Sequence, residues 1–129
     1  MAAPKYIQTQ RSAHQTISAA NTNRDGTGTT PDLIAGASGG TVVKRIRITA
    51  TGTTTDGMIR LFKYDGSSAK FIGEIPVIGI TPSATRQVWQ YSGPIPGGPV
   101  ELPSASHVLR GATHNAETFH VVVEGGDYA

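Results

Sequence analysis

Clusters of turn-forming residues divide this chain into short segments, and this is the feature that most constrains its fold. The clusters are rich in Gly, Pro, Asn, Asp and Ser, which favour turns through left-handed or fixed backbone angles and through hydrogen bonds to their own backbone. They lie at 21–30, 36–40, 51–57, 65–66 and 93–99. No amphipathic helical period fits the segments between them. This spacing predicts an all-β chain folded as an antiparallel β-sandwich or jelly roll.

The segment 41–51 has the alternation expected of a half-buried antiparallel strand. Ile46 and Ile48 share one side of it, Arg47 lies on the other, and Lys44 is the one residue that breaks the alternation. With the other apolar runs, the pattern predicts seven to nine short strands. The further strands are predicted at 15–20, 31–35, 58–64, 69–78, 85–92, 100–102, 108–113 and 117–124.

Four local signals refine this arrangement. The Asp-Gly pair at 65–66 predicts a hairpin between its flanking runs. Pro76 predicts that its strand lies at a sheet edge or contains a bulge, because proline cannot donate to a ladder. The proline-rich segment 93–99 is predicted to stay outside any ladder. The runs 108–113 and 117–124 are predicted to pair with each other.

A chain of 129 residues is long enough for one domain with its own core. Residues 1–14 are polar and aperiodic, so we expect an extended N-terminal arm, or a loosely attached first strand, followed by the sandwich domain at 15–129. The arm carries three candidate partner-binding residues, which are Lys5, Tyr6 and Arg11.

Composition excludes several classes of function. The chain has no cysteine, so it has neither disulfides nor thiolate sites. Eleven basic residues against nine acidic ones give a net charge of +2, which is too even for a nucleic-acid-binding face. No apolar run approaches the ~20 residues of a membrane span, and no secretory signal begins the chain. We expect synthesis in the cytoplasm and no membrane partner.

One loop matches the ligand spacing of a calcium-binding loop. Asn21, Asn23, Asp25 and Asp32 occupy ligand positions 1, 3, 5 and 12, and Gly26 occupies the bend position. The site would be weak, because position 1 is neutral, position 12 lacks the usual Glu and no helices flank the loop. We favour a polar turn whose side chains bond to local amides, with calcium as the alternative.

The remaining polar residues predict neither an enzyme nor a cofactor. Glu117 and His120 fall on opposite sides of a strand, and only an early strand start would place His114 beside His120. His14 and His107 stand alone in the sequence. No phosphate-binding loop, dinucleotide fingerprint or nucleophile elbow is present.

Basic residues cluster on the predicted strands. Arg45 and Arg47 share one side of their strand and could form, with Lys63, a positive stripe on one sheet face. Lys44 and Arg60 lie on the same two predicted strands. Such charges often protect a solvated sheet, but they also suit an acidic partner surface. Arg45 and Arg47 are therefore predicted to bind a partner.

Trp89 and Tyr91 offer a different interpretation. Residues two apart in a strand share a face, so exposed rings here would form a sugar-binding platform. Packing in the core is the alternative role for both rings. The platform would make the protein a carbohydrate-binding module for adsorption to a host surface.

Four segments resemble small virion-associated proteins of tailed bacteriophages, and together they cover about half of the chain. They are ISAANTNRDGTGT at 17–29, RITATGTTTDGMIRLFKYDG at 47–66, IGEIPVIGITPSA at 72–84 and ATHNAETFHVVVEGGDYA at 112–129. The resemblance implies a non-enzymatic β-sandwich of the virion and supplies no catalytic residues. We expect a capsid decoration, or cement, protein that binds the major capsid shell as a homo-oligomer, a dimer or trimer. The alternative is a tail, neck or baseplate component.

Overall fold

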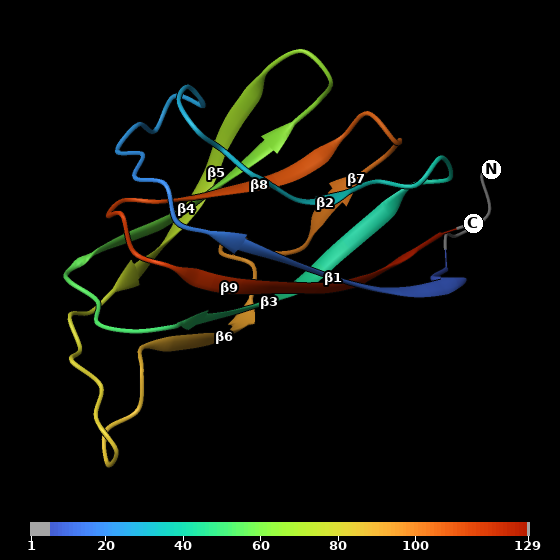
Figure 1. Cartoon of the computed structure of the whole chain (residues 1–129). Helices are drawn as coiled ribbons and strands as arrows, with labels where there is room; N and C mark the ends of the chain where they lie inside the picture. The colour runs from blue at the N-terminus through green and yellow to red at the C-terminus, as the bar shows by residue number, and fades with distance from the viewer. Residues whose placement is uncertain (1–5, 129) are drawn as a thin grey trace.

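The computed structural model describes residues 6–128, and this part of the chain forms nine β-strands and no helix (Figure 1). No segment within it is a helix long and apolar enough to span a membrane. The strands are β1 (Thr9–Ile17), β2 (Asp32–Ala35), β3 (Thr41–Ala50), β4 (Gly57–Tyr64), β5 (Ala69–Val77), β6 (Gln90–Pro94), β7 (Val100–Leu102), β8 (Val108–Thr113) and β9 (Phe119–Asp127).

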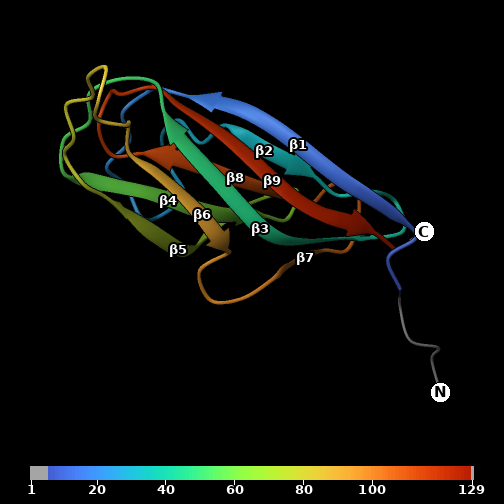
Figure 2. The ribbon, with the colours of Figure 1, turned by 90° about the horizontal axis from the view of Figure 1, so that it is seen from below.

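Two antiparallel sheets pack face to face, which confirms the predicted β-sandwich. The five-stranded sheet has the order β1-β9-β3-β6, and β7 also pairs with β3. The four-stranded sheet has the order β2-β8-β4-β5. Figure 2 shows β1, β9, β3 and β6 lying side by side across one layer. Three of the first four connections cross between the sheets, so each sheet is assembled from strands far apart in the sequence.

The core fills the space between the inner faces of the sheets. Ile46 and Ile48 of β3 are buried beside Val121 of β9, and Leu61 of β4 is buried in the opposite sheet. Each such side chain stabilises the fold by about 1.5–3 kcal/mol through removal of apolar surface from water.

Aromatic packing closes one end of this core. Trp89 and Phe119 are both buried, and their rings meet edge to face with centroids 5.8 Å apart. This is the arrangement that aromatic quadrupoles favour.

A bulge in β3 explains why Lys44 breaks the alternation. The register of β3 against β9 shifts between Val43 and Arg45, so Lys44 is exposed although its position in the sequence predicts burial. Gly125 allows this irregularity, since a Cβ at that position would overlap the carbonyl oxygen of Val42. The predicted alternation around Ile46 and Ile48 is confirmed.

The arm predicted for residues 1–14 requires correction in its described part. Strand β1 begins at Thr9 and pairs with β9 along its whole length, so the boundary predicted after residue 14 falls inside a strand. The alternative of a first strand is the arrangement found. Its alternation was invisible in the sequence because Ile17 is its only fully buried side chain, while backbone hydrogen bonds hold the rest.

Two other predictions were wrong. Gly93 and Pro94 end β6 and pair with β3, so the proline-rich segment enters a ladder at its first residues. Proline is tolerated there because β6 lies at a sheet edge. Strands β8 and β9 do not pair, because they belong to opposite sheets.

Other local predictions are confirmed. Pro76 lies in β5, an edge strand of the four-stranded sheet. The turn at 65–66 joins β4 to β5, and Asp65 closes it by accepting hydrogen bonds from the backbone N–H groups of Ser67 and Ser68 at 3.0 and 2.9 Å.

Candidate interaction surface

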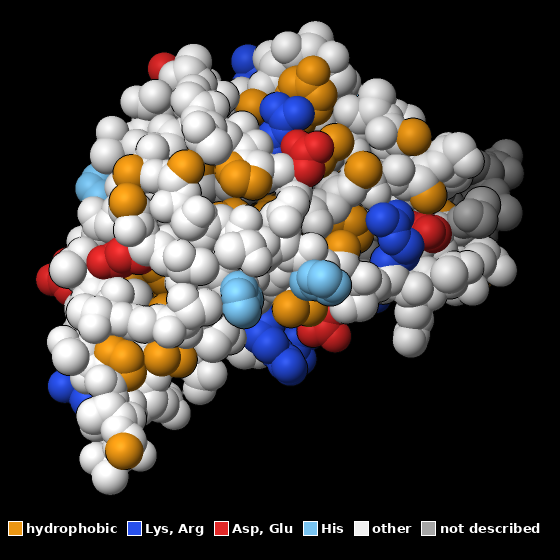
Figure 3. Space-filling model, in the orientation of Figure 1, with side chains coloured by type: hydrophobic (Ala, Val, Ile, Leu, Met, Phe, Trp, Pro, Cys, Tyr) orange, Lys and Arg blue, Asp and Glu red, His pale blue; other side chains and the backbone are white. Residues whose placement is uncertain are grey.

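The outer side of the five-stranded sheet is an open surface of polar and basic side chains, here called the arginine–histidine face. Residues directly opposite each other on paired strands project to the same side of a sheet, so the strand register defines this face. Its residues are Ser12, His14, Thr16, Arg45, Arg47, Thr49, Gln90, Ser92, His120, Val122 and Glu124. In Figure 3, histidine and Lys/Arg side chains gather at the lower margin, below β9 and β3.

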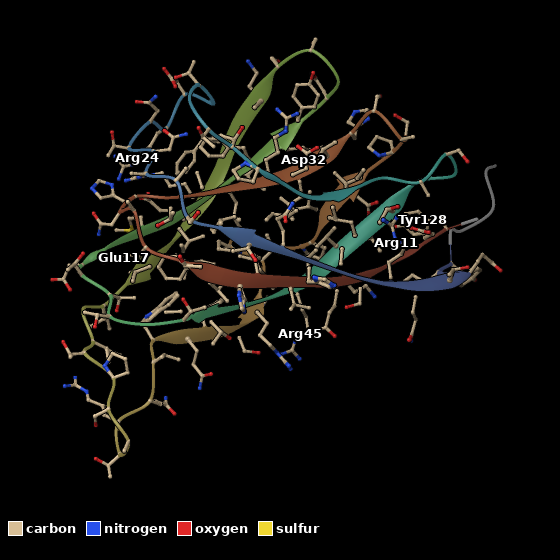
Figure 4. The ribbon with its side chains drawn as sticks, viewed as in Figure 1. Arg11, Arg24, Asp32, Arg45, Glu117 and Tyr128 are labelled. Carbon is tan, nitrogen blue, oxygen red and sulfur yellow. The ribbon has the colours of Figure 1, made fainter. Side chains whose placement is uncertain are left out.

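Arg45 and Arg47 provide the charge of this face. Both are exposed on β3, and Figure 4 shows Arg45 pointing away from the sandwich. Arg45 Nη2 donates a hydrogen bond of 3.3 Å to Ser92 Oγ, and the register places Arg45 opposite Glu124. Neither arginine forms an ion pair with another residue in the range 6–128. Both guanidinium groups therefore lie exposed on this face without a countercharge among the described residues.

His14 and His120 lie on the same face, and sequence reasoning missed this pair. Thr16 is opposite His120 and His14 is opposite Val122, so the two histidines are diagonal neighbours on adjacent strands. Diagonal positions on an antiparallel pair lie roughly 7–8 Å apart. No local sequence signal could reveal the proximity of the two histidines, because it depends on the pairing of β1 with β9, more than 100 residues later in the chain.

The stripe predicted from Arg45, Arg47 and Lys63 is wrong in one member. Lys63 belongs to β4 in the four-stranded sheet, while the two arginines belong to β3 in the five-stranded sheet. Arg60, also in β4, is buried rather than exposed. Sequence reasoning treated 58–64 as a neighbour of 41–51, but the chain changes sheets between them.

The candidate residues near the N-terminus have different environments. Tyr6 is 68% exposed, and Lys5 lies outside the described residues. Arg11 Nη1 lies 3.1 Å from Asp127 Oδ1, which also accepts a 2.7 Å hydrogen bond from Thr41 Oγ1. Arg11 therefore fastens the start of β1 to the end of β9.

A second contact strengthens this end of the sandwich. Tyr128 Oη donates to both carboxylate oxygens of Glu101 at 2.7 and 2.9 Å, and this hydrogen bonding raises the pKa of Tyr128. Figure 4 shows Tyr128 close to Arg11, where β1 begins and β9 ends.

The proposed calcium ligands make hydrogen bonds within the protein. Asn21 Nδ2 donates to the carbonyl oxygens of Thr27 and Thr29, both at 2.9 Å. Asp25 Oδ1 accepts from Thr27 Oγ1 at 2.6 Å and from its N–H at 3.0 Å, and these bonds lower the pKa of Asp25. Asp32 instead accepts from Arg110 Nε at 2.7 Å.

This geometry supports the polar turn. Asn23 also takes part, since its backbone N–H donates to Asn21 Oδ1 at 3.0 Å. Among residues 6–128, no three His, Asp or Glu side chains lie close enough together to hold a metal ion.

The sugar-binding platform is wrong. Trp89 is buried against Phe119, and Tyr91 is half-buried with its Oη donating to the carbonyl oxygen of Pro94 at 2.9 Å. A platform requires both rings to be exposed, and Trp89 belongs to the core.

A buried arginine forms a second polar cluster that the sequence did not reveal. Arg60 is only 2% exposed, although it projects to the outer side of the four-stranded sheet. Its Nε lies 3.2 Å from Glu74 Oε2, and its Nη1 lies 3.3 Å from the carbonyl oxygen of Asn21 and 3.0 Å from His114 Nδ1. The guanidinium can only donate, so Nδ1 of His114 is the acceptor of this hydrogen bond.

The connection between β1 and β2 buries this cluster. Asn21 N–H donates to the carbonyl oxygen of Thr113 at 2.8 Å, and Arg24 pairs with Glu74 at 3.2 Å. The connection therefore bonds to both β8 and β5, on either side of β4. Arg60 acts as a structural anchor under it.

Comparison with known proteins gives a distant likeness. No family model matches the sequence, and no curated protein matches it. A chain of the solved "Cyanophage Pam1 capsid asymmetric unit" is similar over 98% of this chain and 92% of its own, with 14% sequence identity and a TM-score of 0.44.

Proposed function

We propose that this protein is a non-enzymatic structural protein of a bacteriophage virion, and more specifically a capsid decoration protein that binds the major capsid shell as a homo-oligomer. The observation that carries the docking proposal is the arginine–histidine face, on which Arg45 and Arg47 are exposed without an ion pair to the described chain. The assignment to phage rests on the sequence resemblance of the four segments given above.

The strand order supports this proposal. We interpret the orders β1-β9-β3-β6 and β2-β8-β4-β5 as a jelly roll, an architecture that viral capsid and lectin domains use. The sugar-binding platform of Trp89 and Tyr91 does not support a lectin role, because Trp89 is buried.

The chemistry of the face favours an acidic protein surface as the partner. A guanidinium group binds a carboxylate through two parallel hydrogen bonds, which fixes geometry as well as charge. Arg45 and Arg47 are two residues apart on one strand, so their Cα atoms lie roughly 6–7 Å apart. Two carboxylates at that spacing on the shell would match them.

Binding of this kind needs several copies to be strong. An exposed ion pair contributes about 0–1 kcal/mol, so one face with two arginines gives weak attachment. A homo-oligomer that engages several shell subunits at once gains avidity without new contacts. This is the physical reason to propose an oligomer.

Copy number tests the position in the virion. Quantitative mass spectrometry of purified particles would measure this chain relative to the major shell subunit. Copies comparable to the shell subunit would support decoration, about a dozen or fewer would favour the tail, neck or baseplate, and complete absence would overturn the virion assignment.

Charge reversal tests the docking face. Particles lacking this protein would be mixed with the purified wild type, with the double variant Arg45→Glu/Arg47→Glu, and with the control Lys70→Glu/Arg86→Glu. The control changes net charge equally at exposed residues outside the face. We expect at least about tenfold weaker binding for the face variant alone. Equal binding by both variants would overturn the assignment of this face.

A further inference from the structure

The edges of the two sheets are protected unequally. An edge strand exposes a row of unpaired backbone N–H and C=O groups, and proteins interrupt such edges with proline, bulges, short strands or charges. In the five-stranded sheet, β1 forms one edge, and β6 together with the three-residue β7 forms the other. In the four-stranded sheet the edge strands are β2 and β5.

Three of these edges are interrupted. Strand β5 contains Pro76 and a register shift against β4. Strand β2 has only four residues and a register shift against β8. Strand β6 has five residues and ends at Gly93-Pro94. None of the three offers a long regular template to another chain.

Strand β1 is the regular exception. It has nine residues, contains no proline, and its register against β9 runs without a shift from Thr9 opposite Asp127 to Ile17 opposite Phe119. No strand in the described part of the chain pairs with its other edge. Its only Lys, Arg, Asp or Glu side chain is Arg11, whose charge is balanced by Asp127.

We infer that β1 pairs antiparallel with β1 of a second copy of this chain. The inference rests on the homo-oligomer of the proposed function and names its interface. A two-fold axis at Ala13 lets all nine residues pair, because Thr9 then lies opposite Ile17 of the second copy. This register keeps both outer faces on the same side, since opposed residues have the same orientation.

The side chains suit this register. Ser12 lies opposite His14 of the second copy, Arg11 lies opposite Gln15, and Ala13 meets Ala13 at the axis. The Ser12–His14 pair can form a hydrogen bond, and no like charges are opposed. Arg11 and Gln15 keep their bonds to Asp127 and to the carbonyl oxygen of Asp32 within each chain. Small side chains at the axis allow close approach. The five-stranded sheets then join into one continuous sheet.

The pairing makes the proposed docking face larger. The arginine–histidine faces of both copies lie side by side, so Arg45 and Arg47 are presented twice on one surface. A dimer can therefore engage two acidic sites at once.

Cysteine cross-linking tests the register directly, because the natural chain has no cysteine. Cα atoms of directly opposed residues lie about 4.5–5.5 Å apart, within the ~4.4–6.8 Å range of disulfides. We expect Ala13→Cys to form a disulfide-linked dimer under mild oxidation. Thr16→Cys is the matched control on the same strand, since its counterpart lies six residues along the ladder, roughly 20 Å away. Equal cross-linking of both variants, or none in Ala13→Cys, would overturn the register.

Paired charges provide an independent test by light scattering after size-exclusion chromatography. Ser12→Lys/His14→Lys opposes two lysines at two places and is expected to be a monomer. Ser12→Lys/His14→Glu opposes lysine to glutamate at both places and is expected to remain a dimer. Both variants change exposed side chains, so folding should be preserved. Identical masses for the two variants would contradict the interface.

These results remain separable from the particle-binding assay. A wild-type dimer with Ala13→Cys cross-linking but no binding to particles would support the interface and overturn the capsid proposal. Binding to particles by a wild-type protein that stays monomeric in solution and on the particle would overturn this inference and leave the capsid proposal intact.

Discussion

Arg60 donates from Nη1 to Nδ1 of His114 across 3.0 Å, beneath a connection that covers the outer side of the four-stranded sheet. The guanidinium is buried and has only Glu74 as a charge partner in the described chain. Burial of a charge is tolerated only when its partners replace the lost water. The stability of this region therefore depends on those partners.

We expect Glu74→Gln to destabilise the protein by about 2 kcal/mol. The substitution leaves a buried guanidinium without a countercharge, and the cost falls below the usual ~3–5 kcal/mol because Glu74 is partly exposed. Arg24→Ala removes the exposed partner of the same carboxylate and should cost about 0.5 kcal/mol or less. Urea unfolding measures both, and equal losses would contradict a special role for Arg60.

The hydrogen bonds that Asp65 accepts should make the free energy of unfolding depend on pH in the acid range. Hydrogen bonds from Ser68 and Ser67 lower the pKa of Asp65 from 3.8 to about 2. A lowered folded-state pKa contributes stability above the unfolded value of 3.8, and this is lost as pH falls through about 2. We expect Asp65→Asn to be less stable than wild type at pH 6, with the difference disappearing near pH 2. Thermal unfolding across this range measures it, and a constant difference would exclude the mechanism.

Gly125→Ala should destabilise the fold by about 2–4 kcal/mol. The added methyl group would overlap the Val42 carbonyl oxygen, and backbone at this bulge can give way only by disturbing the β3–β9 ladder. Gly52→Ala is the control, because no atom lies within 4 Å of the new Cβ. Denaturant midpoints should separate the two variants clearly. A similar small loss in both would show that the bulge relaxes easily.

Trp89→Ala should cost about 3–5 kcal/mol, because it removes a buried aromatic side chain and leaves a cavity beside Phe119. Trp89 is the only tryptophan, so its fluorescence reports this site alone. We expect blue-shifted emission in the native protein that moves to longer wavelength on unfolding. Native emission typical of water-exposed indole would contradict the buried position and restore the sugar-binding platform.

The sequence predicted those strands whose two sides differ in environment. In β3, Ile46 and Ile48 face the core while Arg47 faces solvent, and this difference produces a period of two. Strand β1 lacks the signal because almost all of its side chains are at least partly exposed, so the predicted boundary after residue 14 was wrong.

The β1–β2 connection buries two residues that the sequence pattern could not predict to be buried. Phe62 and Arg60 lie on the outer side of their sheet, but the β1–β2 connection bonds across that side and both residues are buried. The pairing of His14 with the His120 region likewise depends on contacts between distant segments. Of the arginine–histidine face, the sequence therefore predicted Arg45 and Arg47 only, because their exposure follows from the local alternation of β3.

The position of β9 between β1 and β3 has a consequence for the order of folding. The five-stranded sheet cannot form completely until residues 119–127 have left the ribosome. Strand β1 therefore remains unpaired while the intervening strands are synthesised. Contacts that join the beginning and end of a chain form slowly, because the closure entropy must be overcome first. We expect refolding to be limited by the docking of β9, with β1 ordering afterwards. Strand β1, the last to join its sheet, would then also carry the longest regular edge to which a neighbouring chain could pair.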